Sequence, residues 1–243
     1  MIVLLSDFGG SQYAGMMKGV IHTICTQAEI VDFTHDIRPH SVREGAWVLL
    51  NGYHYFPPRS IFVCVVDPGV GTERDAVFVK TTNYVFIGPD NGLMYPAAHH
   101  DIITQIFPII VEDVPSSTFH GRDIFAKMGA YLEKGLAGRH LGPLKDDFSV
   151  PLEFYLEGRT GEVTQIDHFG NVVTNLLPGE KKDMRVTADG VDEEMKWVRT
   201  FEEGPDDDLF LVTGSCNTLE ICAKRDSASD SIDLEVGDRL TIE

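Results

Sequence analysis

The feature that most constrains the fold is a change of pattern about 150 residues into the 243-residue chain. Before it, short apolar runs alternate with stretches whose apolar residues recur at helical spacing, which is typical of an α/β layer with a mostly parallel sheet. After it, short alternating segments are separated by Gly, Asp and Pro turns, which favours a small β-barrel or sandwich. The sequence therefore predicts two domains, an α/β domain over residues 1–150 and an all-β, barrel-like domain over residues 160–243.

The elements expected in the first domain follow from these patterns. The expected strands are MIVLL, EIVDFTHDI, IFVCVV and a pair within AVFVKTTNYVFIGPDNG that turns at Thr82-Asn83. Helical spacing covers three stretches, 11–25, 41–56 and 121–137. Ser41 and Glu44 have the spacing of a capping box at the start of the second helix. The segment 141–154 is interpreted as a linker, and five short strands are expected after it.

Composition narrows the class of protein. The formal net charge of −18 argues against a nucleic-acid partner, because binding phosphates requires a basic face. No apolar stretch approaches the length that crosses a membrane, and the apolar start is too short for a signal peptide. The four cysteines form no CxxC pair, which favours free thiols in a reducing compartment. The sequence therefore predicts a cytoplasmic protein that binds neither nucleic acid nor membrane.

Acidic residues follow three of the apolar strands of the first domain. Asp7, Asp36 and Asp67 each come after such a run and are followed by turn residues. In open α/β sheets the ligand crevice lies beyond the carboxyl ends of the strands, so these acids are expected to converge there. The alternative is that each is an ordinary turn-former, and that Arg74 makes only a surface ion pair with Asp67.

Further motifs carry polar residues, but the usual signatures are absent. GPDNG (88–92), STFHGRDIF (117–125) and IDHFGNVVTN (166–175) place acids, amides and histidines in loops, and each also fits a plain turn or helix cap. GxGxxG, the P-loop, HExxH and GxSxG do not occur, so nicotinamide, nucleoside triphosphate, zincin and serine-hydrolase chemistries lose support. Residue patterns alone predict a two-domain protein with an acidic crevice.

Five motifs together resemble a known family. SDFG (6–9), VVDPGVGTER (65–74), GPDNG, STFHGRDIF and IDHFGNVVTN occur in the order found in the S-adenosylmethionine hydroxide adenosyltransferases, which are related to the fluorinase and chlorinase. The resemblance implies an N-terminal α/β domain and a C-terminal β-barrel. It also implies a homotrimer that binds its substrate between neighbouring subunits. The implied reaction is hydrolysis of S-adenosylmethionine, in which water attacks C5′ and releases adenosine and L-methionine.

The resemblance assigns three catalytic residues. Asp67, Arg74 and His120 match the Asp, Arg and His that surround the nucleophilic water in the hydrolytic members. Water is a poor nucleophile until a base takes its proton, and either Asp67 or His120 is suited to that role. Arg74 would orient the carboxylate and stabilise a hydroxide-like nucleophile. The leaving group is a neutral thioether, so neither a metal nor a cofactor is expected.

The same matching assigns substrate contacts. Asp7 matches the acid that holds the ribose hydroxyls, and Asp167 the acid that binds the methionine amino group. Phe169 and Asn171 fall in the loop around the adenine and methionine ends, and Ser215 is expected to face the methionine carboxylate.

The chain departs from the relatives' pattern at three positions. Cys216 stands where the fluorinases have an arginine, so recognition of the carboxylate must differ in detail. Gly121 stands where the halogenases place a serine near the halide. Ser6 replaces the commoner threonine.

Three other functions remain as alternatives. Halogenation is disfavoured because the halogenating relatives lack the Asp/Arg/His set and the Asp67 carboxylate would repel a halide. A non-catalytic module that binds a nucleoside or S-adenosylmethionine has little use for three converging ionisable groups. A metal-dependent phosphohydrolase ranks third among the alternatives. It is disfavoured because no two histidines have the i, i+4 spacing of metal ligands on one helix.

Overall fold

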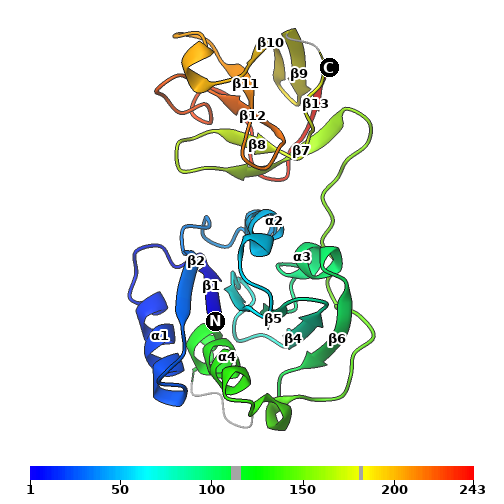
Figure 1. Ribbon diagram of the computed structural model, residues 1–243. Coiled ribbons are helices and arrows are strands. Elements are labelled where there is room, and N and C mark those ends of the chain that lie inside the picture. The colour runs from blue at the N-terminus through cyan, green and yellow to red at the C-terminus, as the bar shows by residue number, and fades with distance from the viewer. Residues whose placement is uncertain (111–115, 181–182) are drawn as a thin grey trace. The chain divides into compact units, whose positions relative to one another are not determined.

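Strands and helices alternate in the first part of the chain, and closely spaced strands build the second part (Figure 1). The computed structural model describes residues 1–110, 116–180 and 183–243, and the chain divides into two units, Met1–Leu152 and Glu153–Glu243. Each unit has its own hydrophobic core. Within the described residues, no helix is both long and apolar enough to span a bilayer.

The first unit contains a six-stranded sheet in the order β2-β1-β3-β5-β4-β6. Its strands are β1 (Ile2–Ser6), β2 (Ile30–Thr34), β3 (Ile61–Val65), β4 (Ala76–Thr81), β5 (Val85–Pro89) and β6 (Ile103–Pro108). Strands β2, β1, β3 and β5 are parallel, whereas β4 runs antiparallel to both of its neighbours. The predicted α/β class with a mostly parallel sheet is confirmed, as is the antiparallel pair that turns at Thr82-Asn83.

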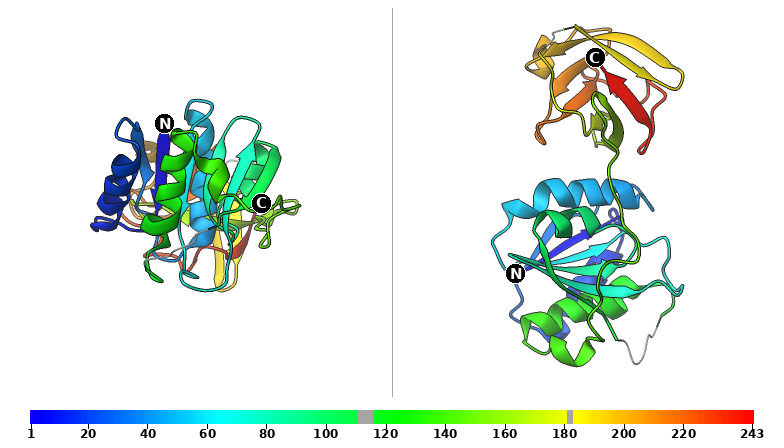
Figure 2. Two further views of the ribbon diagram at one scale, coloured as in Figure 1. Left: turned by 90° about the horizontal axis from the view of Figure 1, so that it is seen from below. Right: turned by 90° about the vertical axis from the view of Figure 1, so that its right-hand side faces the viewer.

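Helices cover both faces of this sheet (Figure 2). They are α1 (Tyr13–Ile24), α2 (Val42–Gly52), α3 (Tyr95–His100) and α4 (Ala126–Glu133). Successive strand residues point to opposite faces, so Val3 and Leu5 join the cluster formed with α2 and α3, while Ile2 and Leu4 join the one formed with α1 and α4. A strand buried on both faces needs apolar residues at every position, which explains the unbroken apolar runs of β1 and β3.

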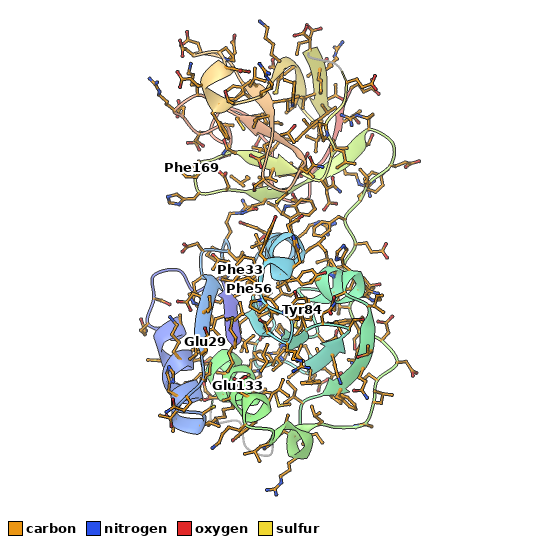
Figure 3. All side chains as sticks on the ribbon, in the orientation of Figure 1. Glu29, Phe33, Phe56, Tyr84, Glu133 and Phe169 are labelled. Carbon is orange, nitrogen blue, oxygen red and sulfur yellow. The ribbon has the colours of Figure 1, made fainter. Side chains whose placement is uncertain are left out.

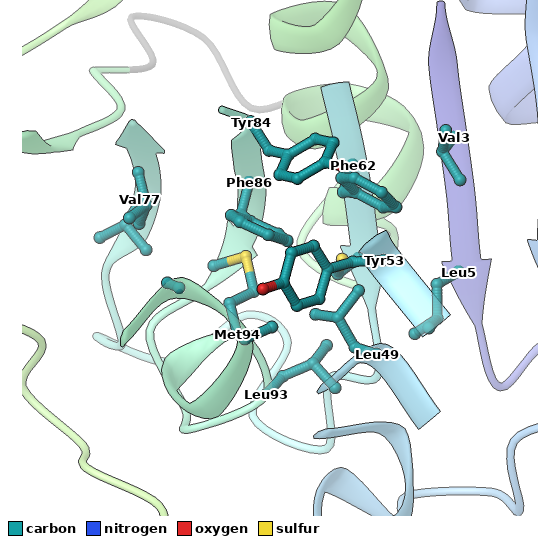
Figure 4. Close-up of a cluster of buried hydrophobic side chains, with 14 of the residues drawn as sticks. Val3, Leu5, Leu49, Tyr53, Phe62, Val77, Tyr84, Phe86, Leu93 and Met94 are labelled. Carbon is teal, nitrogen blue, oxygen red and sulfur yellow. The ribbon is translucent and has the colours of Figure 1, made fainter. Parts of the chain in front are cut away.

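The cluster under α2 and α3 is rich in aromatic rings (Figure 4). The rings of Phe62 on β3 and Phe86 on β5 stack with centroids 5.2 Å apart, and Tyr53 packs edge-on against both. These contacts fix the neighbouring parallel strands whose carboxyl ends carry the site.

The start of α2 was predicted correctly, but the hydrogen bonds expected at its cap were not. Helix α2 begins directly after Ser41, yet the Ser41 side chain makes no cap hydrogen bond to the backbone. Glu44 is buried and accepts a hydrogen bond from Arg38 Nε at 2.8 Å. The predicted capping box is therefore wrong in its hydrogen bonds: the Ser41 backbone N–H donates to Arg38 O, and Glu44 bonds to the side chains of Arg38 and Ser41. The third expected helix begins as a π-helical turn, Gly121–Phe125, before α4.

The interpretation of 141–154 as a linker is wrong for most of that segment. Phe148 is buried in the first unit's core, and Lys145 makes ion pairs with Asp75 and Asp90 at 2.8 Å. Lys145 also forms an isolated β-bridge with Ile106. The segment therefore belongs to the first unit as far as Leu152.

The second unit is a closed barrel with strand order β10-β11-β12-β8-β7-β13-β9, which confirms the predicted barrel. Its strands are β7 (Thr160–Ile166), β8 (Val172–Thr174), β9 (Asp183–Ala188), β10 (Val191–Val198), β11 (Phe210–Thr213), β12 (Leu219–Cys222) and β13 (Arg239–Ile242). Strands β9 and β10 were not among the five expected. Their exposed positions carry charged residues, so only a few inward residues such as Met184, Val186 and Met195 signal a strand.

Candidate active site

The carboxyl ends of β2, β1 and β3 lie side by side at one edge of the sheet, because these strands are parallel neighbours. Asp7 follows β1 and Asp67 lies just after β3, and both line a cavity of about 560 Å³ in the first unit. Asp36, after β2, is exposed and does not line this cavity. The expected convergence of three acids is therefore observed for two of them.

Aromatic side chains form another part of the cavity wall. Phe8, Tyr13 and Phe119 all line it and contact one another edge to face, with ring centroids 5.1–5.8 Å apart. Sequence reasoning missed this group because its members come from a loop, the start of α1 and the segment before the π-helical turn. An apolar wall with a few convergent polar groups is the usual form of a small-molecule site.

Asp67, Arg74 and His120 are brought together beside this cavity. Arg74 Nε donates to Asp67 Oδ1 at 2.9 Å, and one terminal nitrogen of Arg74 donates both to Asp67 Oδ2 and to His120 Nδ1, the latter at 2.8 Å. The Asp67 side chain is 5% exposed and that of Arg74 is 11% exposed. This buried, two-pronged pair differs from the surface ion pair that was the alternative reading.

The glycines of DPGVG allow this arrangement. Gly71 has φ +80, and a Cβ there would lie 2.3 Å from the backbone oxygen of Ser117. Only glycine fits that backbone conformation and that approach. The loop thus turns between Asp67 and Arg74 while packing against the segment that leads to His120.

The protonation of His120 follows from its surroundings. Burial, then the neighbouring Arg74 charge, lowers the pKa of His120, against opposing contributions from Asp67 and Asp123. Arg74 can only donate, so His120 Nδ1 accepts and the proton of the neutral ring is on Nε2. His120 is therefore a neutral hydrogen-bond donor through Nε2.

Gly121 closes the wall next to His120. A Cβ at this position would lie 3.2 Å from both Phe119 Cε2 and Val65 Cγ1, which is tighter than ordinary contact. Position 121 itself therefore contributes no hydroxyl to the cavity wall, in contrast to the serine of the halogenases' pattern.

A hydrogen-bonded chain supports the loop that carries Asp7. Asp32 accepts from Lys18 Nζ at 2.6 Å and from His35 Nε2 at 3.1 Å, and Ser6 Oγ lies 2.6 Å from His35 Nδ1. Because Asp32 accepts the Nε2 proton, Nδ1 of a neutral His35 is an acceptor and the Ser6 hydroxyl donates to it. Asp7 Oδ2 accepts the backbone N–H of His40 at 2.9 Å.

In the second unit, Asp167 organises the loop between β7 and β8. Its Oδ1 accepts the backbone N–H groups of Phe169 and Asn171, both at 2.9 Å, and its Oδ2 accepts Asn171 Nδ2 at 2.8 Å. This holds Phe169 at the tip of the loop, 75% exposed (Figure 3). An exposed phenylalanine on an ordered loop is a candidate for ligand stacking.

A second cavity, of about 660 Å³, begins at this loop. Its lining residues are Phe169, Asn171, Phe201, Ala223, Arg225 and Asp226. Phe201, which is half-exposed, lies in the 3₁₀ turn Phe201–Glu203 and was missed by sequence reasoning because no motif surrounds it. Two aromatic side chains and an amide in one cavity suit a flat, heterocyclic ligand.

Ser215 and Cys216 lie in the turn between β11 and β12, and the Ser215 side chain bonds to the Cys216 thiol. Burial, with a smaller contribution from Glu220, raises the pKa of Cys216. The first unit thus carries Asp7, Asp67, Arg74 and His120, whereas the second carries the four other predicted site residues, Asp167, Phe169, Asn171 and Ser215. Within the described residues, no group of three or more His, Cys, Asp or Glu side chains could hold a metal ion.

Comparison with known proteins identifies the family. Residues 2–142 match the SAM hydroxide adenosyltransferase N-terminal domain, and residues 161–241 match its C-terminal domain. The chain is 34% identical to the (R)-S-adenosyl-L-methionine hydrolase of Methanocaldococcus jannaschii, over 99% of this chain and 95% of that protein. It is 27% identical to a fluorinase of Nocardia brasiliensis, over 78% of each chain.

A solved structure of an uncharacterized conserved protein from Thermotoga maritima superposes with a TM-score of 0.89, at 33% identity and full coverage of both chains. Both domain matches, the full-length relatives and the fold agree. The chain belongs to the S-adenosylmethionine hydroxide adenosyltransferase family.

Proposed function

We propose that this protein hydrolyses S-adenosyl-L-methionine to adenosine and L-methionine. The observation that carries the proposal is the buried Asp67–Arg74–His120 constellation beside a cavity of the first unit, in a chain of this family. A water oxygen forms a bond to C5′ while the C5′–S bond breaks. The sulfonium sulfur keeps that electron pair and leaves as a neutral thioether, so the departing group needs no acid.

The hydrogen bonds divide the roles within the constellation. Asp67 has about four lone-pair directions, of which Arg74 occupies two, so the carboxylate can still accept a proton from water. His120 Nδ1 is already occupied by Arg74, which leaves its Nε2–H to donate to the water oxygen. Asp67 is therefore the acceptor for the proton that water loses, and His120 orients the attacking lone pair. Holding water and C5′ in line supplies much of the remaining acceleration.

The other site residues bind the substrate in this proposal. Asp7 holds the ribose hydroxyls, and Asp167 holds the methionine amino group. Phe169 and Asn171 hold the adenine, joined by Phe201 on the same cavity. Ser215 faces the methionine carboxylate, without the arginine that the fluorinases place at position 216.

The assembly and location of the protein are part of the same proposal. Catalytic and ribose-binding residues lie in one unit and the remaining substrate contacts in the other, which fits a homotrimer whose sites each combine units from two subunits. Free thiols at all four described cysteines fit a cytoplasmic protein.

One incubation tests the reaction. The purified protein is mixed with S-adenosylmethionine in oxygen-18 water, and the products are resolved by chromatography and mass spectrometry. Adenosine labelled at its 5′-hydroxyl and unlabelled methionine are expected, with no 5′-chloro-adenosine at high chloride and no effect of a chelator. The Methanocaldococcus jannaschii relative is named for the (R) epimer, so the (R)-sulfonium substrate should react faster than the (S) epimer.

Other results would change the function. Halogenated nucleoside as the main product would make the protein a halogenase, and label in methionine would rule out attack at C5′. Tight binding of S-adenosylmethionine without any product would favour the binding-module alternative.

A further inference from the structure

One buried acid of the barrel has no role in the proposal above. Glu220, on β12, is 8% exposed, and its side chain lies over Gly214. A Cβ at position 214 would lie 1.6 Å from Glu220 Oε1, so the carboxyl group occupies the space that a side chain at this position would need. In the sheet register Glu220 is paired with Val173, two residues beyond Asn171 of the second cavity. Side chains two apart share a face of a strand, so Glu220 and Asn171 lie on the same face of the barrel.

Among the described residues, no cation accompanies Glu220. Over residues 1–110, 116–180 and 183–243, no hydrogen bond or ion pair reaches its carboxyl group. The ionisable groups that act on it or feel its charge are Asp167, Cys216 and Cys222, and none of these can be positive. Burial, reinforced by the Asp167 charge, raises the pKa of Glu220 to about 7. A buried acid without a partner is costly to ionise, and such groups concentrate at functional sites.

Asp167 has capacity for one more donor. Its carboxylate accepts three hydrogen bonds from its own loop, two at Oδ1 and one at Oδ2. One lone-pair direction on Oδ2 remains for a ligand, since a carboxylate offers about four. One direction is too few for a primary ammonium group, which has three N–H donors.

We propose that Glu220 acts with Asp167 as a second carboxylate for the primary ammonium group of the substrate, and that this pair selects substrates that carry an ammonium group. The inference rests on the proposed function for the identity of the substrate. A cation fits the surroundings because the second unit carries 22 acids and 9 bases. A metal ion fits less well, since the described residues offer no cluster of three or more ligating side chains.

This pairing has a consequence for pH. The ammonium ligand favours ionised Glu220, so binding below neutral pH must displace a proton from the acid. Affinity for the substrate should therefore fall as pH drops from 8 to 6, approaching tenfold per unit below the pKa of Glu220. An analogue without the ammonium group should not show this dependence.

Calorimetric titration of the full-length Asp67→Asn protein, chosen to keep the ligand intact, measures the effect. The two ligands are S-adenosylmethionine and its analogue in which hydrogen replaces the α-amino group. Glu220→Gln should weaken binding of S-adenosylmethionine by about tenfold or more at pH 8 and change binding of the analogue by less than about twofold. Glu193→Gln removes an exposed acid of β10 and should leave both affinities unchanged.

If Glu220→Gln fails to fold, the full-length Asp67→Asn protein, whose second unit is unchanged, gives a second readout. With Glu220 intact, only S-adenosylmethionine should release protons on binding, up to about half a proton at pH 7, measured in buffers of different ionisation enthalpy. Equal proton release for both ligands, or equal weakening of both by Glu220→Gln, would overturn the inference while leaving hydrolysis intact.

The outcomes also separate the two proposals. Glu220-dependent binding without any adenosine formation would remove the hydrolase proposal and keep the ammonium site. No binding of S-adenosylmethionine at all would remove both.

Discussion

Two buried carboxylates, one in each unit, differ in the charge of their neighbours. Asp67 in the first unit lies under a two-pronged arginine, which in turn donates to His120. Glu220 in the second unit is equally buried but has only another acid, Asp167, as its charged neighbour. The first unit thus holds its own compensating charge, which suits a neutral reactant such as the water of the proposed reaction. Among the described residues of the second unit, Glu220 has no cationic neighbour, and a charged ligand would supply one.

The largest effect should come from breaking the compensated pair. Asp67→Asn and Arg74→Ala should each reduce kcat by roughly a hundredfold or more, with a smaller effect on KM, because the water loses its proton acceptor or that acceptor loses its orientation. Steady-state kinetics on folded, purified variants measures both constants. Unchanged kcat in either variant would return the DPGVGTER loop to a structural role.

The burial of Glu220 without a cation should make the free energy of unfolding depend on pH. The pKa of Glu220 is raised from 4.5 to about 7, so the folded state binds the extra proton and stability is lost as pH rises between these values. Glu220→Gln removes this penalty. Its stability relative to wild type should therefore improve by about 2–3 kcal/mol between pH 5 and pH 8.

Urea denaturation followed by Trp197 fluorescence, in a Trp47→Phe background, reports on the barrel at both pH values. Glu193→Gln removes the same charge from an exposed position and should show no such pH-dependent gain. A pH-independent difference for Glu220→Gln would mean that Glu220 is solvated or has a cationic partner in solution.

Mixing experiments test whether the two regions act across subunits. Asp67→Asn and Asp167→Ala chains are each expected to be inactive, and trimers that contain both chains should regain about a third of wild-type activity. That is the fraction of interfaces that pair an intact first unit with an intact neighbouring second unit. Activity of verified mixed trimers is the measurement, and no recovery would place the whole site within one chain.

The smallest effect is expected from the chain of hydrogen bonds behind Asp7. Ser6→Ala removes the hydroxyl that joins His35 to the Asp7 loop, and should raise KM about fivefold with little change in kcat. Ser6→Thr keeps the hydroxyl and should restore KM. Equal losses in kcat for both variants would point to packing rather than to positioning of Asp7.

Much of the fold could be predicted from the sequence, because its signals are local. Unbroken apolar runs such as IFVCVV mark strands buried on both faces, and the three helical stretches were found to within a few residues. Elements with weak periodicity escaped, namely α3 and β6 in the first unit and the charged hairpin β9–β10 in the second. A helix as short as Tyr95–His100 has too few turns to show a period.

The candidate site divides in the same way. The sequence motifs identified Asp67, Arg74 and His120, and the proposed chemistry explains why an acid, a cation and a histidine are needed. Which acids meet depends on the tertiary structure: Asp7 and Asp67 line one cavity at the ends of the adjacent strands β1 and β3, whereas Asp36 is exposed although β2 is also next to β1. Phe201 and Glu220 had no motif to mark them, since their roles depend on neighbours from other strands and turns.

The sequence by itself determined the fold class, the family and the residue types of the site, because periodicity and motif spacing are properties of the chain. Only the tertiary structure decided which charges are compensated. Arg74 reaches Asp67 because the loop closes at Gly71, whereas Glu220, buried on β12 beside Gly214, has no cation among its described neighbours. Burial and pairing set the cost of a charge, and both arise from contacts between residues far apart in the chain.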